Sequence, residues 1–293
     1  MRVTITGADG MLGSAVMSEL ADMELFPLVE PTFVLEDRDG VRRAIMETRP
    51  DWVVHTAAMT DVDGCEEKPA LAYSINAMGT LNVALACAAC DAGLFYISTD
   101  FVFGAREHRT PIEAWETPAP LSVYGTSKFG GERYAELIAP RSIIARTAWL
   151  YGHHGKHFVG TILNRARQGL PLRVVDDQCG SPTYANDVAI GIAALLSRGV
   201  PGWYHLVNRG AVSWFDFARA IVFKAGMDPE CIDPCSTEDF QRPAPRPKYS
   251  VLSTFTYEQT TNRTMRVWDE ALTEFIQGLG DVDPDEERLD TLS

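Results

Sequence analysis

The chain has 293 residues, 46% of them hydrophobic, and a formal net charge of −14 at pH 7. The hydrophobic content supports a sizeable core and excludes a disordered chain. The negative charge argues against a general nucleic-acid binder, because such a protein needs a basic surface to neutralise phosphates. An anionic small substrate would require a local cluster of Arg or Lys.

The first residues enter a predicted strand, Val3 to Thr6, directly, so we expect no signal peptide. No uninterrupted apolar run approaches the ~18 residues that span a bilayer. The six cysteines are dispersed. Cys87 and Cys90 form a CxxC within an alanine-rich segment, which favours buried, reduced helix residues over a redox motif. These features predict a cytoplasmic protein with no membrane partner.

Short apolar runs alternate with helical segments along the first half of the chain. After the first strand we expect helices over 12–22, 41–48, 76–92 and around 124–128, and strands over 25–29, 52–55, 94–98 and 142–146. This alternation is typical of a doubly wound α/β fold, in which helices cover both faces of a parallel sheet.

The rhythm loosens from about Tyr151. Strands are expected over 172–175 and 204–207, helices over 186–197 and 214–225, and a Pro-rich stretch follows at 242–247. We predict a first domain over residues 1–150, a smaller C-terminal α/β lobe over 151–280, and an acidic tail over 281–293. Part of the segment 185–200 is expected to pack on the first domain.

A glycine-rich loop follows the first strand and opens a helix, which is the context that dinucleotide binding requires. Gly7 permits the tight turn, Gly10 lets the backbone approach a pyrophosphate, and Gly13 allows close helix packing. Met11 and Leu12 lie between them and belong to the same predicted cofactor site.

Glu30 stands at the end of the second predicted strand, where an acid can hold a ribose 2′-hydroxyl. A solvated loop carboxylate is an equally plain interpretation. Arg38, Arg42 or Arg43 would instead meet a 2′-phosphate, so the sequence leaves NADH and NADPH both open.

Tyr124 and Lys128 are four residues apart and would share one face of a helix. An adjacent ammonium favours the ionised form of a phenol, so Lys128 is expected to lower the pKa of Tyr124. Thr99 ends a strand at the edge where α/β sheets bind ligands, and its hydroxyl can polarise a carbonyl. Each feature alone has an ordinary explanation, such as a strand-end hydroxyl or an exposed helix pair. Their ordered combination with the glycine loop predicts hydride transfer, with Thr99, Tyr124 and Lys128 catalytic.

This combination resembles the extended short-chain dehydrogenase/reductase superfamily. Five segments narrow the resemblance: 97–103 (ISTDFVF), 120–125 (PLSVYG), 146–152 (RTAWLYG), 177–183 (DQCGSPT) and 246–250 (RPKYS). Together they resemble the dTDP-4-dehydrorhamnose reductase family, over nearly the whole chain to about Gly278.

The resemblance implies a Rossmann-type sheet with a smaller nucleotide-sugar lobe. It implies reduction by NADPH or NADH of the C4 ketone of a dTDP-4-keto-6-deoxyhexose, such as dTDP-4-dehydrorhamnose. On the cofactor side it adds Ala57, Ala58, Asn76 and Ser98. On the sugar side it assigns Thr99, Asp100, Phe101, Trp149, Gln178, Gly180, Pro182, Thr183 and Arg246, the last as a diphosphate contact. Trp149 as a core residue and Arg246 as a solvated one remain alternatives.

Two departures fall near the expected sugar pocket. The family commonly has tyrosine where this chain has Phe101, and Gly155-Lys156-His157-Phe158 replaces a Gly-Asn-Asn-Phe pattern, so the identity of the sugar stays open. His153, His154 and His157 lie close in sequence, but no nearby carboxylate or cysteine completes a metal site, and we expect no metal.

Two other functions remain open. A nucleotide-sugar epimerase with bound NAD would use the same three catalytic residues, and relatives of this fold also serve as the non-catalytic beta subunit of methionine adenosyltransferase. Such relatives often dimerise, so a homodimer is one assembly that the resemblance allows.

Overall fold

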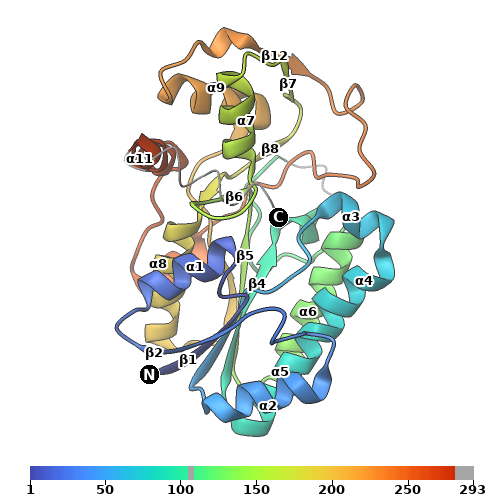
Figure 1. The fold of residues 1–293 in the computed structure, drawn as a ribbon, viewed down its shortest axis with the longest axis vertical. Helices are drawn as coiled ribbons and strands as arrows, with labels where there is room; N and C mark the ends of the chain where they lie inside the picture. The colour runs from blue at the N-terminus through green and yellow to red at the C-terminus, as the bar shows by residue number, and fades with distance from the viewer. Residues whose placement is uncertain (105–108, 281–293) are drawn as a thin grey trace.

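The computed structural model describes residues 1–104 and 109–280, and a six-stranded parallel sheet forms its centre (Figure 1). The strand order is β10-β5-β4-β3-β1-β2. The strands are β1 (Arg2–Thr6), β2 (Glu24–Leu28), β3 (Trp52–His55), β4 (Gly93–Thr99), β5 (Ser142–Thr147) and β10 (Gly202–His205). The doubly wound parallel sheet is therefore confirmed. The predicted tail, residues 281–293, lies outside the described residues.

The central strands are apolar on both faces because helices cover both. Every residue of β3 and β4 is buried, as continuous apolar runs predict for interior parallel strands. β10 was expected among the strands of the looser second half, but it joins this sheet by pairing in parallel with β5. The chain thus returns to the sheet after residue 200.

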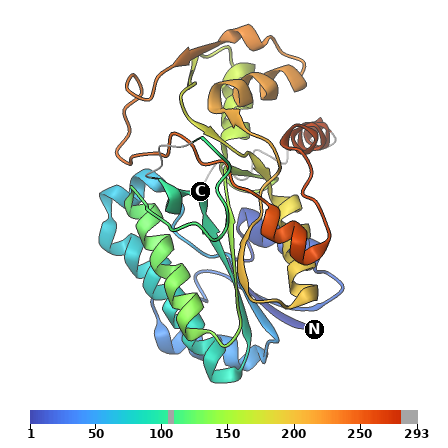
Figure 2. The same cartoon turned by 180° about the vertical axis from the view of Figure 1, so that it is seen from behind.

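Two groups of helices cover the sheet, and Figures 1 and 2 show them on opposite faces. On one face lie α2 (Arg38–Thr48), α5 (Thr80–Cys90) and α6 (Val123–Ile138). On the other lie α1 (Met11–Glu19), α8 (Ala185–Arg198) and α10 (Phe255–Thr261). The short segments α3 (Val62–Glu67), α4 (Pro69–Tyr73), the π-helical η1 (Ser74–Gly79) and the 3-10 turn η2 (Asp100–Phe103) lead into and out of the first group.

One helical run is long and apolar enough, by length and composition, to cross a membrane. It joins α4, η1 and α5 over Pro69–Cys90, with a mean hydropathy of 1.3 in its most apolar window. More than half of that window, 56%, is buried inside the protein, where α5 packs between α2 and α6. The apolar character of this run is thus accounted for by its place in the core, although the sequence had suggested no run of this length.

The second lobe is built around its own apolar core, in which α7 and α9 pack on a two-stranded parallel pair (Figure 1). Its elements are α7 (Phe158–Arg167), β7 (Leu172–Val175), α9 (Trp214–Lys224), η3 (Pro229–Cys231), β12 (Ile232–Cys235) and α11 (Trp268–Gly280). Short pairs join the lobe to the sheet: β6 (Leu150–Tyr151) with β9 (Thr183–Tyr184), and β8 (Cys179–Gly180) with β11 (Val212–Ser213).

Helix α8 shares the core of the sheet rather than that of the second lobe. Val188, Ile192 and Leu195 pack with Val3 and Val16. The domain boundary at residue 150 therefore remains a prediction. Helix α8 and strand β10, which follow that residue, pack with the sheet.

A buried ion pair joins helix α6 to the sheet. Arg146 on β5 and Glu132 on α6 are 2% and 0% exposed. Arg146 Nε and Nη2 donate to Glu132 Oε1 and Oε2 at 2.7 and 3.0 Å, and Nη1 donates to the Ala114 carbonyl at 3.0 Å. Because both charges are fully partnered, the pair fixes α6 against β5.

Replacing Glu132 by Gln leaves the Arg146 guanidinium as an unpaired buried charge. We expect the free energy of unfolding to fall by about 3–5 kcal/mol, measured by chemical denaturation. The double variant Glu132→Met, Arg146→Met removes both charges and should lose much less. Equal losses in the single and double variants would contradict this role of the pair.

Candidate active site

A cavity of about 750 Å³ opens at the carboxyl ends of the sheet strands. The glycine loop follows β1, Glu30 follows β2, Ala57 and Ala58 follow β3, and Ser98 and Thr99 end β4. Parallel sheets bind ligands at this edge because connections diverge there. The sequence-predicted cofactor residues Gly7, Gly10, Met11, Leu12, Gly13, Glu30, Ala57, Ala58, Ser98, Tyr124 and Lys128 all line this cavity.

The glycine loop is packed so closely that side chains would not fit. Gly7 has a φ of +66°, and a Cβ there would lie 2.9 Å from the Ala57 backbone. A Cβ on Gly13 would lie 2.0 Å from the Gly7 carbonyl oxygen. The N-terminus of α1 behind Gly10 has no side-chain cap. Its free N–H groups and positive dipole end suit a phosphate group.

Two buried hydroxyls in the cavity have no hydrogen-bond partner in the part of the chain that the structure describes. Ser98 Oγ and Thr147 Oγ1 accept and donate no hydrogen bond within the described residues, and both line the cavity. A buried polar atom without a partner costs free energy, so the cavity has polar groups in place for a polar ligand. Together with the glycine loop, these residues fit a nicotinamide dinucleotide.

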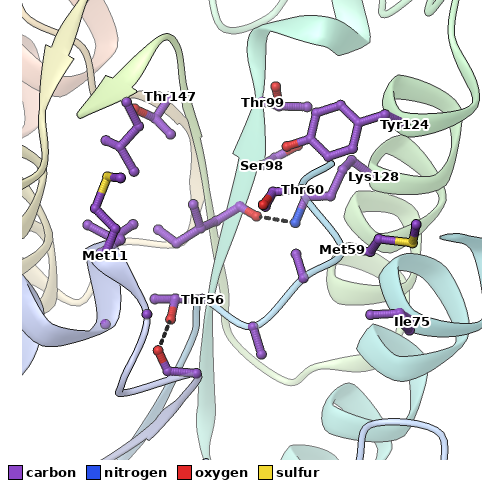
Figure 3. A pocket seen from close by; sticks show the side chains of 18 of the residues that line it. Met11, Thr56, Met59, Thr60, Ile75, Ser98, Thr99, Tyr124, Lys128 and Thr147 are labelled. Carbon is purple, nitrogen blue, oxygen red and sulfur yellow. Dashed lines mark hydrogen bonds between the residues drawn. The ribbon is translucent and has the colours of Figure 1, made fainter. Parts of the chain in front are cut away.

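Tyr124 and Lys128 extend side by side from α6 toward the strand that carries Ser98 and Thr99 (Figure 3). Lys128 Nζ donates to the Ile97 carbonyl at 2.7 Å and lies 4.4 Å from the centre of the Tyr96 ring. Ser122 caps the helix by accepting from Gly125 N, so α6 begins directly before Tyr124. The predicted catalytic residues are thus brought together at one wall.

The electrostatics of this wall differ from the sequence-based expectation. Burial raises the pKa of Tyr124, a hydrogen bond with Thr99 opposes the rise, and the charge of Asp100 adds to it. Burial also lowers the pKa of Lys128 to about 7, against the opposing charge of Glu132. The pKa of Tyr124 therefore shifts in the direction opposite to the expected lowering, because desolvation is the largest influence on this buried phenol. Tyr124 is held neutral and ready to donate a proton.

Asp100 lines both cavities, and its Oδ2 has no hydrogen-bond partner among residues 1–104 and 109–280. Burial raises its pKa to about 6, although hydrogen bonds from Ser250 and Thr99 oppose this rise. Its other oxygen accepts from Thr99 Oγ1 at 3.1 Å. Asp100 therefore orients the Thr99 hydroxyl next to Tyr124.

A second cavity of about 890 Å³ adjoins the first and lies between the sheet and the second lobe. Asp100, Phe101 and Trp149 line both cavities. Four arginines reach the second one: Arg165, Arg173, Arg242 and Arg246. In a chain with a net charge of −14, such a cluster supplies the local cations that an anionic ligand needs.

Trp149 forms an aromatic platform in this second cavity. Its ring stacks on Trp214 with centroids 3.5 Å apart and an interplanar angle of 7°. A Cβ on Gly180 would lie 2.4 Å from the Trp149 ring, so the small residue allows the ring to lie flat. Phe101 meets Tyr124 edge-on at 5.4 Å. Phe101, where the family commonly has tyrosine, therefore lines both cavities.

Several predicted residues do not reach either cavity lining. Asn76 anchors the turn after β3 by hydrogen bonds to both backbone groups of Met59 and to Ser127. Pro182 and Thr183 are buried behind the wall, where Thr183 N donates to the Trp149 carbonyl. These residues support site residues from behind, because their side chains are used in packing and turns.

The arginines suggested for a 2′-phosphate also lie elsewhere. Arg42 and Arg43 line a separate shallow hollow on α2, and Arg38 is absent from the described lining of the cofactor cavity. Gln178 and Arg246 do line the second cavity, as expected.

Sequence reasoning missed several lining residues, among them Thr60, Thr147, Lys156, Arg165, Arg173 and Trp214. Thr147 could have been predicted, because it belongs to the segment 146–152 that carries the family resemblance. Arg165 lies on α7, Arg173 on β7 and Trp214 on α9. Only the folded lobe brings these residues into one cavity with Trp149.

His153 and His157 have structural partners. His153 Nε2 shares a hydrogen bond with the Tyr184 hydroxyl, and His157 Nδ1 accepts from Gly160 N at the start of α7. Among residues 1–104 and 109–280, no group of three His, Cys, Asp or Glu is placed to hold a metal ion.

Comparisons with known proteins identify the family of the chain. A family model described as the RmlD substrate binding domain matches residues 1–280. The dTDP-4-dehydrorhamnose reductase of Mycolicibacterium smegmatis is 40% identical over 279 residues, which cover 94% of this chain and 85% of that protein. The chain belongs to this reductase family.

Other members of the family show the same extent of likeness. The spore coat polysaccharide biosynthesis protein SpsK of Bacillus subtilis is 39% identical, covering 94% of this chain and 97% of that protein. A crystal structure of dTDP-4-dehydrorhamnose reductase from Bacillus anthracis in complex with NADP has a TM-score of 0.91 and 37% identity, covering 94% and 99% of the two chains. A UDP-glucose 4-epimerase from Thermus thermophilus, 24% identical with a TM-score of 0.86, shares the fold. The predicted resemblance is confirmed.

The lowered pKa of Lys128 should appear in the stability of the protein. Between about pH 7 and pH 10 the unfolded chain binds a proton that folded Lys128 lacks, so the free energy of unfolding gains up to about 1.4 kcal/mol per pH unit from this group. Lys128→Met should therefore be more stable than the parent protein at pH 7, and this advantage should shrink toward pH 10. Denaturant unfolding across this range measures it, with the exposed Lys68→Met as control. An advantage independent of pH would contradict the assignment.

Proposed function

We propose that the chain is an NADPH- or NADH-dependent oxidoreductase that reduces the C4 ketone of a dTDP-4-keto-6-deoxyhexose. One observation carries the proposal: in a dinucleotide-type cavity, Tyr124 and Thr99 contact Phe101 and Asp100, which also line a second cavity with several arginines. A ketone where the two cavities adjoin would meet both a proton donor and a bound cofactor.

The second cavity suits a nucleoside diphosphate sugar in charge and shape. The arginines supply positive charge for a diphosphate. The stacked pair Trp149–Trp214 supplies a flat apolar surface next to Phe101. Gln178, whose Nε2 donates to Thr237 Oγ1, lines the same cavity and presents its amide oxygen as an acceptor. We assign this region to the thymidine diphosphate part of the substrate.

A reduced nicotinamide bound in the first cavity would supply the hydride. The free N–H groups at the start of α1 would hold the pyrophosphate. Glu30 would bind the adenine ribose, and Ser98 and Lys128 lie in the same cavity nearer Tyr124.

Residues of the chain would stabilise the negative charge that develops on the ketone oxygen. Tyr124 donates a hydrogen bond to that oxygen and transfers its proton to it as general acid, and Thr99 would turn its single hydroxyl proton from Asp100 Oδ1 to the same oxygen. Burial raises the pKa of Tyr124, which keeps the phenol protonated until the oxygen becomes basic. Lys128 in its cationic form then stabilises the phenolate that remains.

Tyr124→Phe removes the proton donor and keeps the ring. We expect turnover with a dTDP-4-keto-6-deoxy sugar to fall by about 10²–10⁴-fold, while the dissociation constant for the cofactor stays unchanged. Tyr134→Phe is the matched control, because Tyr134 lies on the same helix and its hydroxyl contacts the Met78 sulfur away from the cavity. Full activity of Tyr124→Phe would reject the mechanism, and absence of NAD(P)H oxidation by the parent protein would reject the function.

Glu30 should discriminate between the two cofactors. Its carboxylate lines the cavity after β2, and Lys128 and Lys156 are the cationic side chains of the described lining. Repulsion of a 2′-phosphate by Glu30 predicts a preference for NADH, and Glu30→Gln should raise the NADPH-to-NADH ratio of kcat/KM by about tenfold. Glu36→Gln, an exposed carboxylate outside the lining, controls for the change of net charge. An unchanged ratio would show that Glu30 does not contact the ribose.

A further inference from the structure

One carboxylate on the sheet side of the cavities holds the arginine loop of the second lobe. Asp63, in the first turn of α3, accepts from Arg246 Nη1 at 3.1 Å through Oδ1 and from Nη2 at 2.9 Å through Oδ2. The same carboxylate accepts from Ala244 N at 3.2 Å and from Arg242 Nη1 at 3.3 Å. The Asp63 carboxylate therefore binds three residues of the loop 242–246.

The pairing with Arg246 is stronger than a surface ion pair. Asp63 and Arg246 are 25% and 18% exposed, and the two parallel N–H···O bonds form a bidentate fork. Arg242 is 48% exposed, so its longer contact contributes less. Partial burial alone would raise the pKa of Asp63, but the hydrogen bonds and charges of Arg246 and Arg242 outweigh it and lower the pKa. Asp63 is thus a carboxylate at neutral pH.

Helix α3 is anchored on its other side to the catalytic helix. Glu66 Oε1 accepts from Val123 N at 2.7 Å, and Val123 is the first residue of α6 and the neighbour of Tyr124. Cys65 packs in one apolar cluster with Tyr124. A short chain of contacts therefore runs from Arg246 through α3 to the proton donor.

Arg246 keeps binding capacity despite this pairing. Its Nη atoms donate to Asp63 and to the Ala244 carbonyl, while its side chain lines the second cavity. A guanidinium has further N–H donors, and one carboxylate between two arginines leaves a net positive charge. The geometry thus orients Arg246 without neutralising the cluster.

We propose that Asp63 is a positioning residue, which holds Arg246 at a set distance from Tyr124 so that Arg246 meets a phosphate of the substrate while the ketone lies at Tyr124. This inference rests on the proposed function and deepens it. Asp63 touches neither substrate nor cofactor in this arrangement and acts through Arg246.

A double-mutant cycle on the full-length protein tests the inference, with Asp63→Asn, Arg246→Gln and the double variant. Asp63→Asn should raise KM for the dTDP-4-keto-6-deoxy sugar by about tenfold, with kcat changed by less than about threefold and KM for NADH unchanged. In the Arg246→Gln background the same change should have an effect below about twofold, because its partner is gone.

Asp61→Asn is the matched control. It removes one negative charge two residues away and keeps a side chain that can cap α3 by accepting from Gly64 N, so KM for the sugar nucleotide should not change. Additive effects of Asp63→Asn and Arg246→Gln, or an equal rise of KM in Asp61→Asn, would overturn the positioning role while the reductase function stands. Absence of turnover and of dTDP binding by calorimetry in the parent protein would overturn both.

Discussion

The buried pair between Arg146 and Glu132 is the constraint on which the site depends. Two charges that are 2% and 0% exposed tolerate burial only with full hydrogen bonding, and that requirement sets the position of α6 on β5. Glu132, Lys128 and Tyr124 follow one another at four-residue intervals on this helix, so they share a face. The pair that fixes the helix therefore also fixes the position of Tyr124, and the Glu132 carboxylate opposes the loss of charge at Lys128.

Burial explains why Tyr124 stays protonated in this site. It raises the pKa of Tyr124 and lowers the pKa of Lys128 to about 7. Both shifts disfavour charge in this buried wall. Anionic groups of a cofactor and substrate would restore the cationic form of Lys128, which couples ligand binding to stabilisation of the phenolate. The arginines of the second cavity add the charge that the rest of an acidic protein does not provide.

The sequence predicted the parts of the site that depend on local pattern. The strands β3 and β4 are continuous apolar runs, the glycine loop follows β1, and Tyr124 and Lys128 share a helical face, so periodicity and spacing were enough. It did not predict contacts between distant segments. Asp63 and Arg246 are 183 residues apart, and β10 joins β5 across the second lobe. It also gave the wrong sign for the pKa of Tyr124, because desolvation depends on how closely the folded wall excludes water.

The central claim is that the chain moves a hydride from a cofactor in the first cavity to a sugar ketone at its junction with the second. The most direct measurement uses a nicotinamide cofactor deuterated at its transferable position, a dTDP-4-keto-6-deoxyhexose, and NMR of the product. The account predicts one deuterium at C4 of the reduced sugar for each cofactor oxidised. A sugar changed in configuration with no net oxidation of cofactor, or no transfer of deuterium to C4, would contradict it.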